Sequence, residues 1–242
     1  MAQFVNGGFE TGDTSGWTTG SGYRALVYNA DLTPGDFLPG GSSYRGDLQH
    51  SAVVDKGTMA HTDGALDQVY SGNHSFRAED LEIGGYASAI TQRVNGYKDS
   101  NIFFAWAATL EGAHGTNDSA TFKLVLRDET LGTDIISRSY NAAVNGSGTD
   151  SRFAVTQDGN FFYTKAWQVE QLPLSAGSIG HDFSLTLLAA DCALTAHQGT
   201  VYLDGFGAVN PPPIPEPETY AMMLAGLGAI GFAARRRKGR PD

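Results

Sequence analysis

The residues that could do chemistry gather first in a glycine-rich stretch, where Glu111, His114 and Asp118 follow one another closely. A histidine beside carboxylates can serve general acid–base catalysis, and two opposed carboxylates can hydrolyse glycosidic bonds. The same residue types among glycines are also typical of a solvated turn. The motifs GxSxG, HExxH and GxxxxGK, which mark serine hydrolases, zinc proteases and P-loops, do not occur in the sequence. We therefore predict that the chain is not an enzyme.

The single cysteine, Cys192, limits the sulfur chemistry of the chain. One cysteine cannot form an internal disulfide, nor can it supply the several thiolates of a common structural zinc site. A free cysteine usually behaves as a small hydrophobic residue. We expect Cys192 to be buried within a strand.

These residues must be positioned by β-strands, because short runs of Val, Ile, Phe and Tyr alternate with clusters of Gly, Asn, Asp and Ser. Apolar residues recur at every second position in Phe122, Leu124 and Leu126, which indicates one buried face. The pattern predicts an all-β, antiparallel, jelly-roll-like sandwich. The clearest predicted strands are residues 101–109, 120–128, 133–140, 161–172, 181–188 and 199–209, and residues 31–67 read as a long insertion or loop region.

Residues 211–215 read Pro-Pro-Pro-Ile-Pro, which forces an extended polyproline II spacer and ends the sheet-forming region. We predict three parts. A β-sandwich domain occupies residues 1–209, a proline-rich linker residues 210–218, and a transmembrane helix with a basic tail residues 219–242.

The C-terminal part is predicted to cross a membrane. Sixteen uncharged residues, 219–234, span roughly 24 Å as a helix and are followed by a basic cluster, which sets that end in the cytoplasm. A soluble amphipathic helix is the alternative, but the run has no polar face and holds three glycines. The predicted membrane residues include Tyr220, Leu224, Gly226, Leu227, Gly228, Ile230 and Phe232, and the cytoplasmic anchor is Arg235, Arg236, Arg237 and Lys238.

Pro215-Glu216-Pro217, the glycine-rich span and the arginine cluster occur in the order of a PEP-CTERM sorting signal, which this tail resembles. The resemblance implies recognition of Pro215, Glu216 and Pro217 by an exosortase, a membrane-embedded cysteine protease of Gram-negative bacteria that make extracellular polysaccharide. It implies an inner-membrane precursor with a periplasmic body, which reaches the cell surface or the medium after processing. No apolar leader follows Met1, so we expect the chain to begin near a mature N-terminus.

Two segments, residues 6–10 (NGGFE) and 201–206 (VYLDGF), resemble the first and last strands of galactose-binding-like jelly rolls, which include carbohydrate-binding modules. In that superfamily the two strands lie side by side, and an early glutamate and a late aspartate often ligate a structural Ca²⁺ together with backbone carbonyls. The resemblance implies Glu10 and Asp204 as calcium ligands. Leu203 and Gly205 stand where the superfamily usually has a second acid.

Charge and aromatic content restrict the partners. The formal net charge is −10, and the tail holds many of the basic residues, so the body without the tail is still more acidic. An acidic body argues against nucleic acid as a partner. Sugar binding would need exposed rings, and the large rings available are Trp17, Trp106, Trp167, Tyr23 and Tyr44. Trp106 and Trp167 lie within predicted strands and are expected in the core, and Trp17, next to a turn, is expected to cover the end of the sandwich. Three functions remain open: a glycan-binding protein of the envelope, biofilm or exopolysaccharide matrix, a small hydrolase acting on matrix polysaccharide, and a purely structural adhesin. We favour the first.

Overall fold

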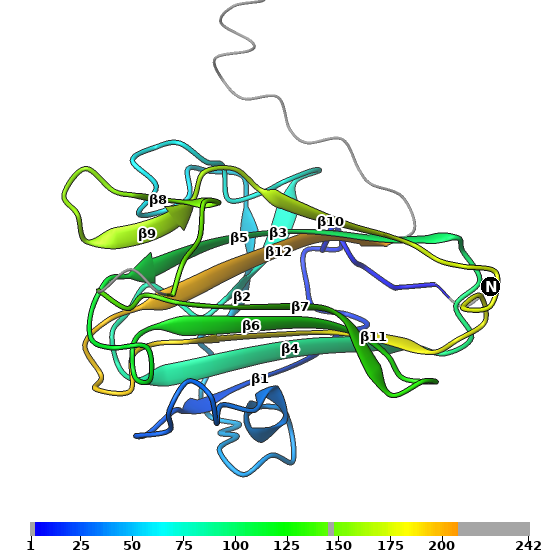
Figure 1. Cartoon of the computed structure of the whole chain (residues 1–242), viewed down its shortest axis with the longest axis horizontal. Helices are drawn as coiled ribbons and strands as arrows, with labels where there is room; N and C mark the ends of the chain where they lie inside the picture. Colours follow the sequence, from blue (N-terminus) through cyan, green and yellow to red (C-terminus); the bar gives the residue numbers. More distant parts are fainter. Residues whose placement is uncertain (1–2, 145–147, 208–242) are drawn as a thin grey trace, which may run out of the picture. The chain divides into compact units, whose positions relative to one another are not determined.

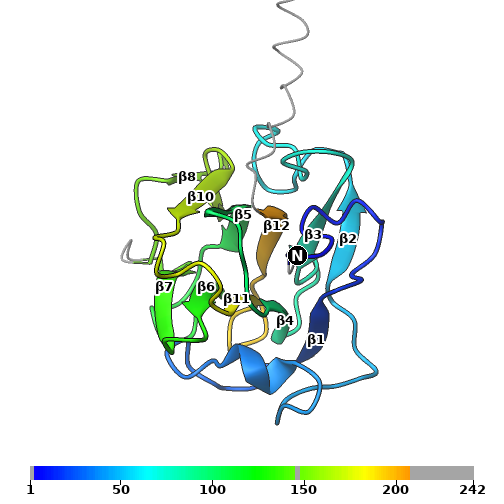
Figure 2. The ribbon, with the colours of Figure 1, turned by 90° about the vertical axis from the view of Figure 1, so that its right-hand side faces the viewer.

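The structure, a computed structural model, describes residues 3–144 and 148–207, and this part of the chain forms two antiparallel sheets (Figure 1). The five-stranded sheet has the order β1 (Thr18–Tyr23), β4 (Tyr86–Val94), β11 (Phe183–Ala190), β6 (Thr121–Asp128) and β7 (Thr133–Asn141). The seven-stranded sheet has the order β2 (Ala52–Asp55), β3 (His74–Ala78), β12 (Gly199–Gly207), β5 (Asn101–Glu111), β9 (Phe161–Thr164) and β8 (Phe153–Val155), and β10 (Gln168–Pro173) also pairs with β5. Figure 2 shows the sheets as two layers. The predicted all-β, antiparallel sandwich is confirmed.

The core lies between the two sheets. On β6 the side chains of Phe122, Leu124 and Leu126 are fully buried, whereas Lys123 and Val125 point outward, as the alternation predicts. Trp106 of β5 is also fully buried; its ring stacks on Tyr140 and contacts the Phe122 ring at a tilt of 57°. Burial of these large rings provides the main hydrophobic stabilisation of the sandwich.

The outer face of each sheet is covered by irregular segments. Leu32 and Phe37 pack on Ala87 and Ala89 of β4, while Met59 and Leu66 pack on Ala107 and Tyr202 of the other sheet. The small alanine side chains let these segments approach the sheets closely. The predicted loop region 31–67 is therefore a packed cover, and it contains one 3₁₀ turn, η1 (Pro34–Phe37), and strand β2.

Two detailed expectations were wrong. The run 161–172 is two strands, β9 and β10, which pair with different stretches of β5. They separate because Trp167 turns onto the outer cluster, where its Nε1–H donates to the Asp67 carbonyl at 2.9 Å. Cys192 is fully buried as expected, but it follows β11 in a turn instead of lying within a strand.

The N-terminal segment lies against the last strand, as the jelly-roll resemblance implies. The Phe206 N–H donates to the Gly7 carbonyl at 3.0 Å, although residues 6–10 are a series of turns and not a strand. A side chain at Gly7 would collide with the Phe206 carbonyl, because a Cβ atom there would lie 1.7 Å from that oxygen.

The predicted linker and the transmembrane tail, residues 210–242, lie outside the described residues. Among residues 3–144 and 148–207, no helix is long and apolar enough to span a membrane.

Candidate functional site

Glu10 and Asp204 converge on one short segment, residues 70–74, which leads into β3. The Asp204 carboxylate accepts hydrogen bonds from the backbone N–H groups of Tyr70 and Ser71, each at 2.9 Å. Glu10 accepts hydrogen bonds from the N–H groups of Asn73 and His74 at 2.8 and 3.0 Å. Two carboxylates that lie near opposite ends of the described sequence therefore hold the same turn.

Burial dominates the electrostatics of this pair. Asp204 is fully buried, and burial raises the pKa of its carboxyl to about 7, although three backbone N–H groups oppose the shift and the charge of Glu10 adds to it. Gly8 lies between the two, because a Cβ atom there would be 3.5 Å from Asp204 Oδ1 and 3.8 Å from Glu10 Cγ. Carboxylate oxygens beside a glycine-rich backbone are the hard donors that Ca²⁺ prefers.

A second group of polar and aromatic side chains lies where β1 ends and β4 begins. The rings of Tyr23 and Tyr86 are 5.0 Å apart, and the His50 ring stacks on Tyr86 at 3.8 Å. The Arg45 guanidinium lies 5.5 Å from the Tyr23 ring, and His50 Nδ1 is 2.7 Å from a carboxylate oxygen of Asp80. We name these five residues the tyrosine surface. Tyr23 is 45% exposed, so the row presents aromatic area to solvent.

Buried carboxyl groups lie beneath the tyrosine surface. Glu79 is fully buried and in a left-handed backbone conformation, and it accepts a hydrogen bond from the Ser88 hydroxyl at 2.9 Å. Burial raises the pKa of Glu79 well above its usual value, and burial raises the pKa of Asp191 to about 7. Neither carboxyl reaches the solvent, so the acids with raised pKa values are separated from any ligand on the surface above.

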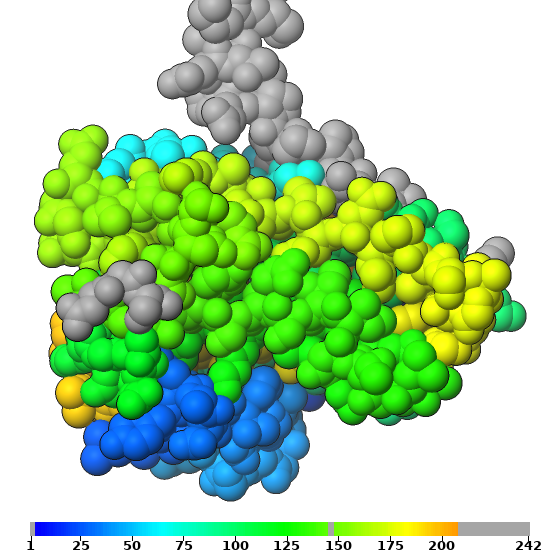
Figure 3. Space-filling model, viewed as in Figure 1, coloured from blue at the N-terminus to red at the C-terminus, as the bar shows by residue number. Residues whose placement is uncertain are grey.

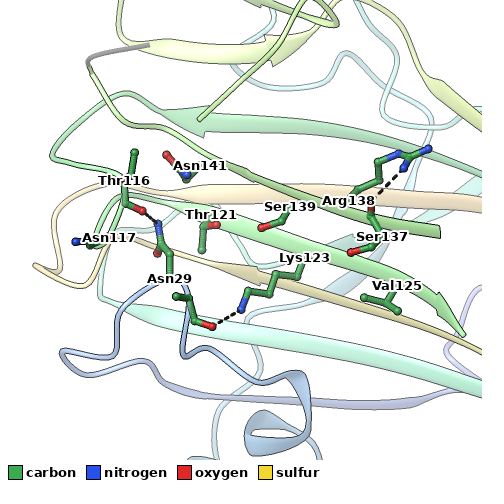
Figure 4. A pocket seen from close by; sticks show the side chains of 11 residues that line it. Asn29, Thr116, Asn117, Thr121, Lys123, Val125, Ser137, Arg138, Ser139 and Asn141 are labelled. Carbon is green, nitrogen blue, oxygen red and sulfur yellow. Dashed lines mark hydrogen bonds between the residues drawn. The ribbon is translucent and has the colours of Figure 1, made fainter. Parts of the chain in front are cut away.

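A hollow of about 450 Å³ lies on the outer face of β6 and β7 (Figure 4). Lys123 crosses it and donates to the carbonyls of Ala30 and Leu32, and the Asn29 amide donates to the Thr116 carbonyl. Figure 3 shows the early, blue part of the chain beside these green strands. The lining consists of hydroxyl, amide and charged groups with aliphatic side chains and holds no aromatic ring. The hollow can hydrogen-bond a polar molecule but cannot stack on it.

The five aromatic residues considered as sugar-binding candidates lie in different parts of the structure. Trp106 is in the core, as expected, and Trp17 covers Phe9 and Phe206 as a part of the packing. Trp167 packs on an outer cluster instead of in the core. Of the five rings, Tyr23 is the one with a large exposed area.

The acid and histidine residues near β5 do not assemble into an acid–base site. Glu111 accepts a hydrogen bond from the Gln198 N–H at 3.1 Å, and Asp118 caps the turn by accepting from the Gly115 N–H. His114 faces His197 instead of either acid.

Sequence reasoning missed His50, Asp80 and Tyr86. His50 lies in the loop before β2, Asp80 lies two residues after β3, and Tyr86 begins β4, so only tertiary contacts bring them together. The facing of Tyr23 and Tyr86 follows from the register of β1 on β4, which pairs these two residues directly.

Several solved structures resemble the sandwich. TmCBM61 in complex with beta-1,4-galactotriose has a TM-score of 0.42 and 13% identity over 85% of this chain and 96% of that chain. A cyclase from Fischerella sp. TAU has a TM-score of 0.39 and 14% identity over 86% and 96%. The K1 cleaved adhesin domain of Lys-gingipain from Porphyromonas gingivalis W83 has a TM-score of 0.37 and 11% identity over 83% and 94%. Likenesses at this level say nothing about ligand or activity.

No curated protein matches the chain. One family, described as the PEP-CTERM protein-sorting motif, matches residues 213–238. The match includes the Pro215-Glu216-Pro217 triplet and ends at Lys238, the last residue of the basic cluster. The chain therefore carries a PEP-CTERM protein-sorting motif, which marks it as an exported protein.

Proposed function

We propose that the chain is an exosortase substrate of a Gram-negative bacterium, whose sandwich binds neutral polysaccharide of the envelope or biofilm matrix after the tail is removed. The sorting motif at residues 213–238 is the observation that supports the first half. In this proposal the apolar run and the basic cluster hold the precursor in the inner membrane, with the sandwich in the periplasm. The small residues Gly226 and Gly228 would allow close approach of a protease helix.

The tyrosine surface supports the second half. Sugar-binding surfaces use aromatic rings against the C–H faces of pyranoses, with nearby charged and amide groups holding the hydroxyls. Tyr23 and Tyr86 supply adjoining rings, and Arg45 and Asp80 supply a donor and an acceptor beside them. The net charge of −10 disfavours a polyanionic glycan, so the proposed ligand is uncharged.

Binding without turnover is the proposed activity. The carboxyls with raised pKa values near the tyrosine surface, Glu79 and Asp191, are fully buried and engaged with Ser88 and with backbone N–H groups. A general acid must reach the glycosidic oxygen to donate its proton. Glu79 and Asp191 are therefore proposed to stabilise the fold and not to act as general acids.

A structural Ca²⁺ held by Glu10 and Asp204 with backbone carbonyls completes the proposal. Its role would be to fix the N-terminal turns and residues 70–74 against β12, because the ion would offset the repulsion between the two carboxylates. It would therefore stabilise the sandwich without touching the tyrosine surface.

The test of glycan binding is a titration of the full chain, purified in detergent, against neutral polysaccharides on an array. Tyr23→Ala and Tyr86→Ala are each expected to weaken binding roughly fivefold, since aromatic contacts contribute about 1 kcal/mol. Leu131→Ala is the matched control, because Leu131 is exposed on the β6–β7 hairpin at the other end of the sandwich. The polysaccharide chain length should stay constant during incubation.

Two results would contradict this assignment. Unchanged affinity in both tyrosine variants, together with loss of binding in Lys123→Gln, would move the site to the hollow on β6 and β7. Shortening of the polysaccharide by the wild-type chain would make the protein a hydrolase.

A further inference from the structure

Three side chains with soft or borderline donor atoms meet at one end of the sandwich. His114 comes from the loop after β5, and Cys192 and His197 come from the turn between β11 and β12. One donor atom from each residue lies within 4.8 Å of the others. Cys192 Sγ is 3.4 Å from His197 Nδ1, and the two imidazole rings are 4.7 Å apart in an edge-to-face arrangement.

The backbone fixes this cluster through contacts between the two loops. The Ala193 N–H donates to the Asp118 carbonyl at 2.8 Å, and the Cys192 N–H donates to the His197 carbonyl at 2.8 Å. The buried Arg24 guanidinium bonds the carbonyls of both Ser119 and Asp191, one from each loop. The three donors therefore rest on a tied pair of turns, not on free loops.

The histidine donor His114 and the sulfur of Cys192 each have a feature that suits a metal ligand. His114 Nε2 is buried and has no hydrogen-bond partner among residues 3–144 and 148–207, and a buried polar atom of this kind is costly. Its residue also has a left-handed backbone, with φ at 61°, a conformation that side chains rarely adopt. The Ala196 N–H donates to Cys192 Sγ at 3.2 Å, which would stabilise negative charge on that sulfur.

The geometry points to a binding site for a divalent transition-metal ion, Zn²⁺ or a close analogue, ligated by His114, Cys192 and His197. Two imidazoles and one thiolate match zinc, whose tetrahedral donors stand about 3.3–3.8 Å apart. The distance between Cys192 Sγ and His197 Nδ1 already lies in this range. The donor atom of His114 is within 4.8 Å of the other two, so it would need to move by only about 1 Å for all three to bind one ion. Three protein ligands leave a fourth position for water or an added ligand.

This site differs from the proposed calcium site in chemistry and in place. Calcium takes hard oxygen donors, whereas the cluster offers nitrogen and sulfur. Binding converts the Cys192 thiol to a thiolate and releases one proton to solvent. In an exported protein, a bound metal would also protect the single cysteine from oxidation.

The test uses the full chain in detergent, stripped of metal, and titrates Zn²⁺ by calorimetry and Co²⁺ by absorption. We expect one equivalent of Zn²⁺ to bind, with proton release and a rise in Tm, and Co²⁺ to give tetrahedral d–d bands with a sulfur-to-cobalt charge-transfer band. His114→Asn, His197→Gln and Cys192→Ala should each weaken Zn²⁺ binding at least about 100-fold, more than the usual loss from an outer partner.

The matched control is His61→Asn. His61 has φ at 57°, close to that of His114, so the same change is made in the same backbone conformation but away from the cluster. It should leave Zn²⁺ affinity unchanged. If Cys192→Ala fails to fold, the comparison of His114→Asn with His61→Asn still decides the matter.

Zn²⁺ affinity in His114→Asn equal to that of the wild type would overturn the proposal. A Co²⁺ spectrum without the thiolate band would do the same, since it would place the ion at other groups. Ca²⁺ in excess should not displace Zn²⁺; displacement would mean that the two ions share a site.

Discussion

Glu10 and Asp204 lie almost 200 positions apart in the sequence and hold the same turn, residues 70–74, by accepting its backbone N–H groups. The turn leads into β3, whose other end leads to Glu79, below the tyrosine surface, and to Asp80, which is part of that surface. The N-terminal turns, β3 and β12 thus form one connected unit. Changes at the carboxylate pair are expected to affect the stability of the sandwich.

Calcium should stabilise the protein through this pair. At about 5 mM, Ca²⁺ is roughly 5 to 50 times the Kd of about 0.1–1 mM that is typical of extracellular calcium sites, so Tm should rise by several degrees relative to EDTA. Glu10→Gln and Asp204→Asn should each abolish the rise in differential scanning calorimetry. Asp134→Asn, a change at an exposed acid on β7, is the control and should keep it. An equal rise in all three variants would contradict the calcium assignment.

Stability should fall as pH rises in the absence of metal. Burial raises the pKa values of Asp191 and Asp204 to about 7, and raises that of Glu79. The folded state then binds protons more tightly than the unfolded chain, whose aspartates titrate near pH 4. This stabilisation is fully present below about pH 4 and is lost as pH rises through 7.

The measurement is urea unfolding in EDTA at several pH values. From pH 4.5 to 7.5 the free energy of unfolding should decrease by roughly 3 kcal/mol for each of Asp191 and Asp204. Asp150, whose pKa is held at about 2 chiefly by its hydrogen bond to Arg152, titrates below this window. Stability that increases steadily over the same range would refute the assignment of protonated buried carboxyls.

Arg24 should be a major contributor to stability. Its buried guanidinium bonds the carbonyls of Val27, Ser119 and Asp191, and burial lowers its pKa to about 10. Arg24→Met leaves these carbonyls unpaired and should cost about 3 kcal/mol or more. Arg93→Met, which removes an exposed ion pair with Asp182, should cost less than about 1 kcal/mol. Similar losses for the two variants in urea unfolding would contradict this account.

Gly7 should tolerate no side chain. Gly7→Ala places a Cβ atom against the Phe206 carbonyl and should destabilise the sandwich by about 2 kcal/mol or more. A Cβ atom at Gly35 meets nothing within 4 Å, so Gly35→Ala should be neutral within about 1 kcal/mol. Thermal unfolding compares the two, and a stable Gly7→Ala variant would show that the N-terminal segment can separate from β12.

The sequence predicts individual strands better than it predicts which residues meet across the fold. The alternation in Phe122, Leu124 and Leu126 predicts the buried face of β6 because the pattern is local. The prediction of one strand over residues 161–172 is wrong because the Trp167 ring packs on a loop distant in sequence, and the chain there forms two strands. The tyrosine surface and the His114–Cys192–His197 cluster depend on strand register and loop contacts, which a single sequence does not display.

The assignment of Cys192 illustrates the same limit. Counting cysteines rightly excludes a disulfide and a site of several thiolates. The count does not reveal that one thiol lies beside two imidazoles, because His114 is far from Cys192 in the sequence. The Pro215-Glu216-Pro217 triplet, by contrast, is read directly from the sequence, and its segment is the one that the sorting motif matches.

The most direct test of the central claim is the fate of the tail in a bacterium that carries an exosortase. The full chain should be shortened and released from the inner membrane, and deletion of Pro215–Pro217 should leave a full-length precursor in the membrane fraction on an immunoblot. Deletion of residues 210–212, of equal length and outside the matched segment 213–238, should be processed normally. Normal release of the Pro215–Pro217 deletion would contradict the account.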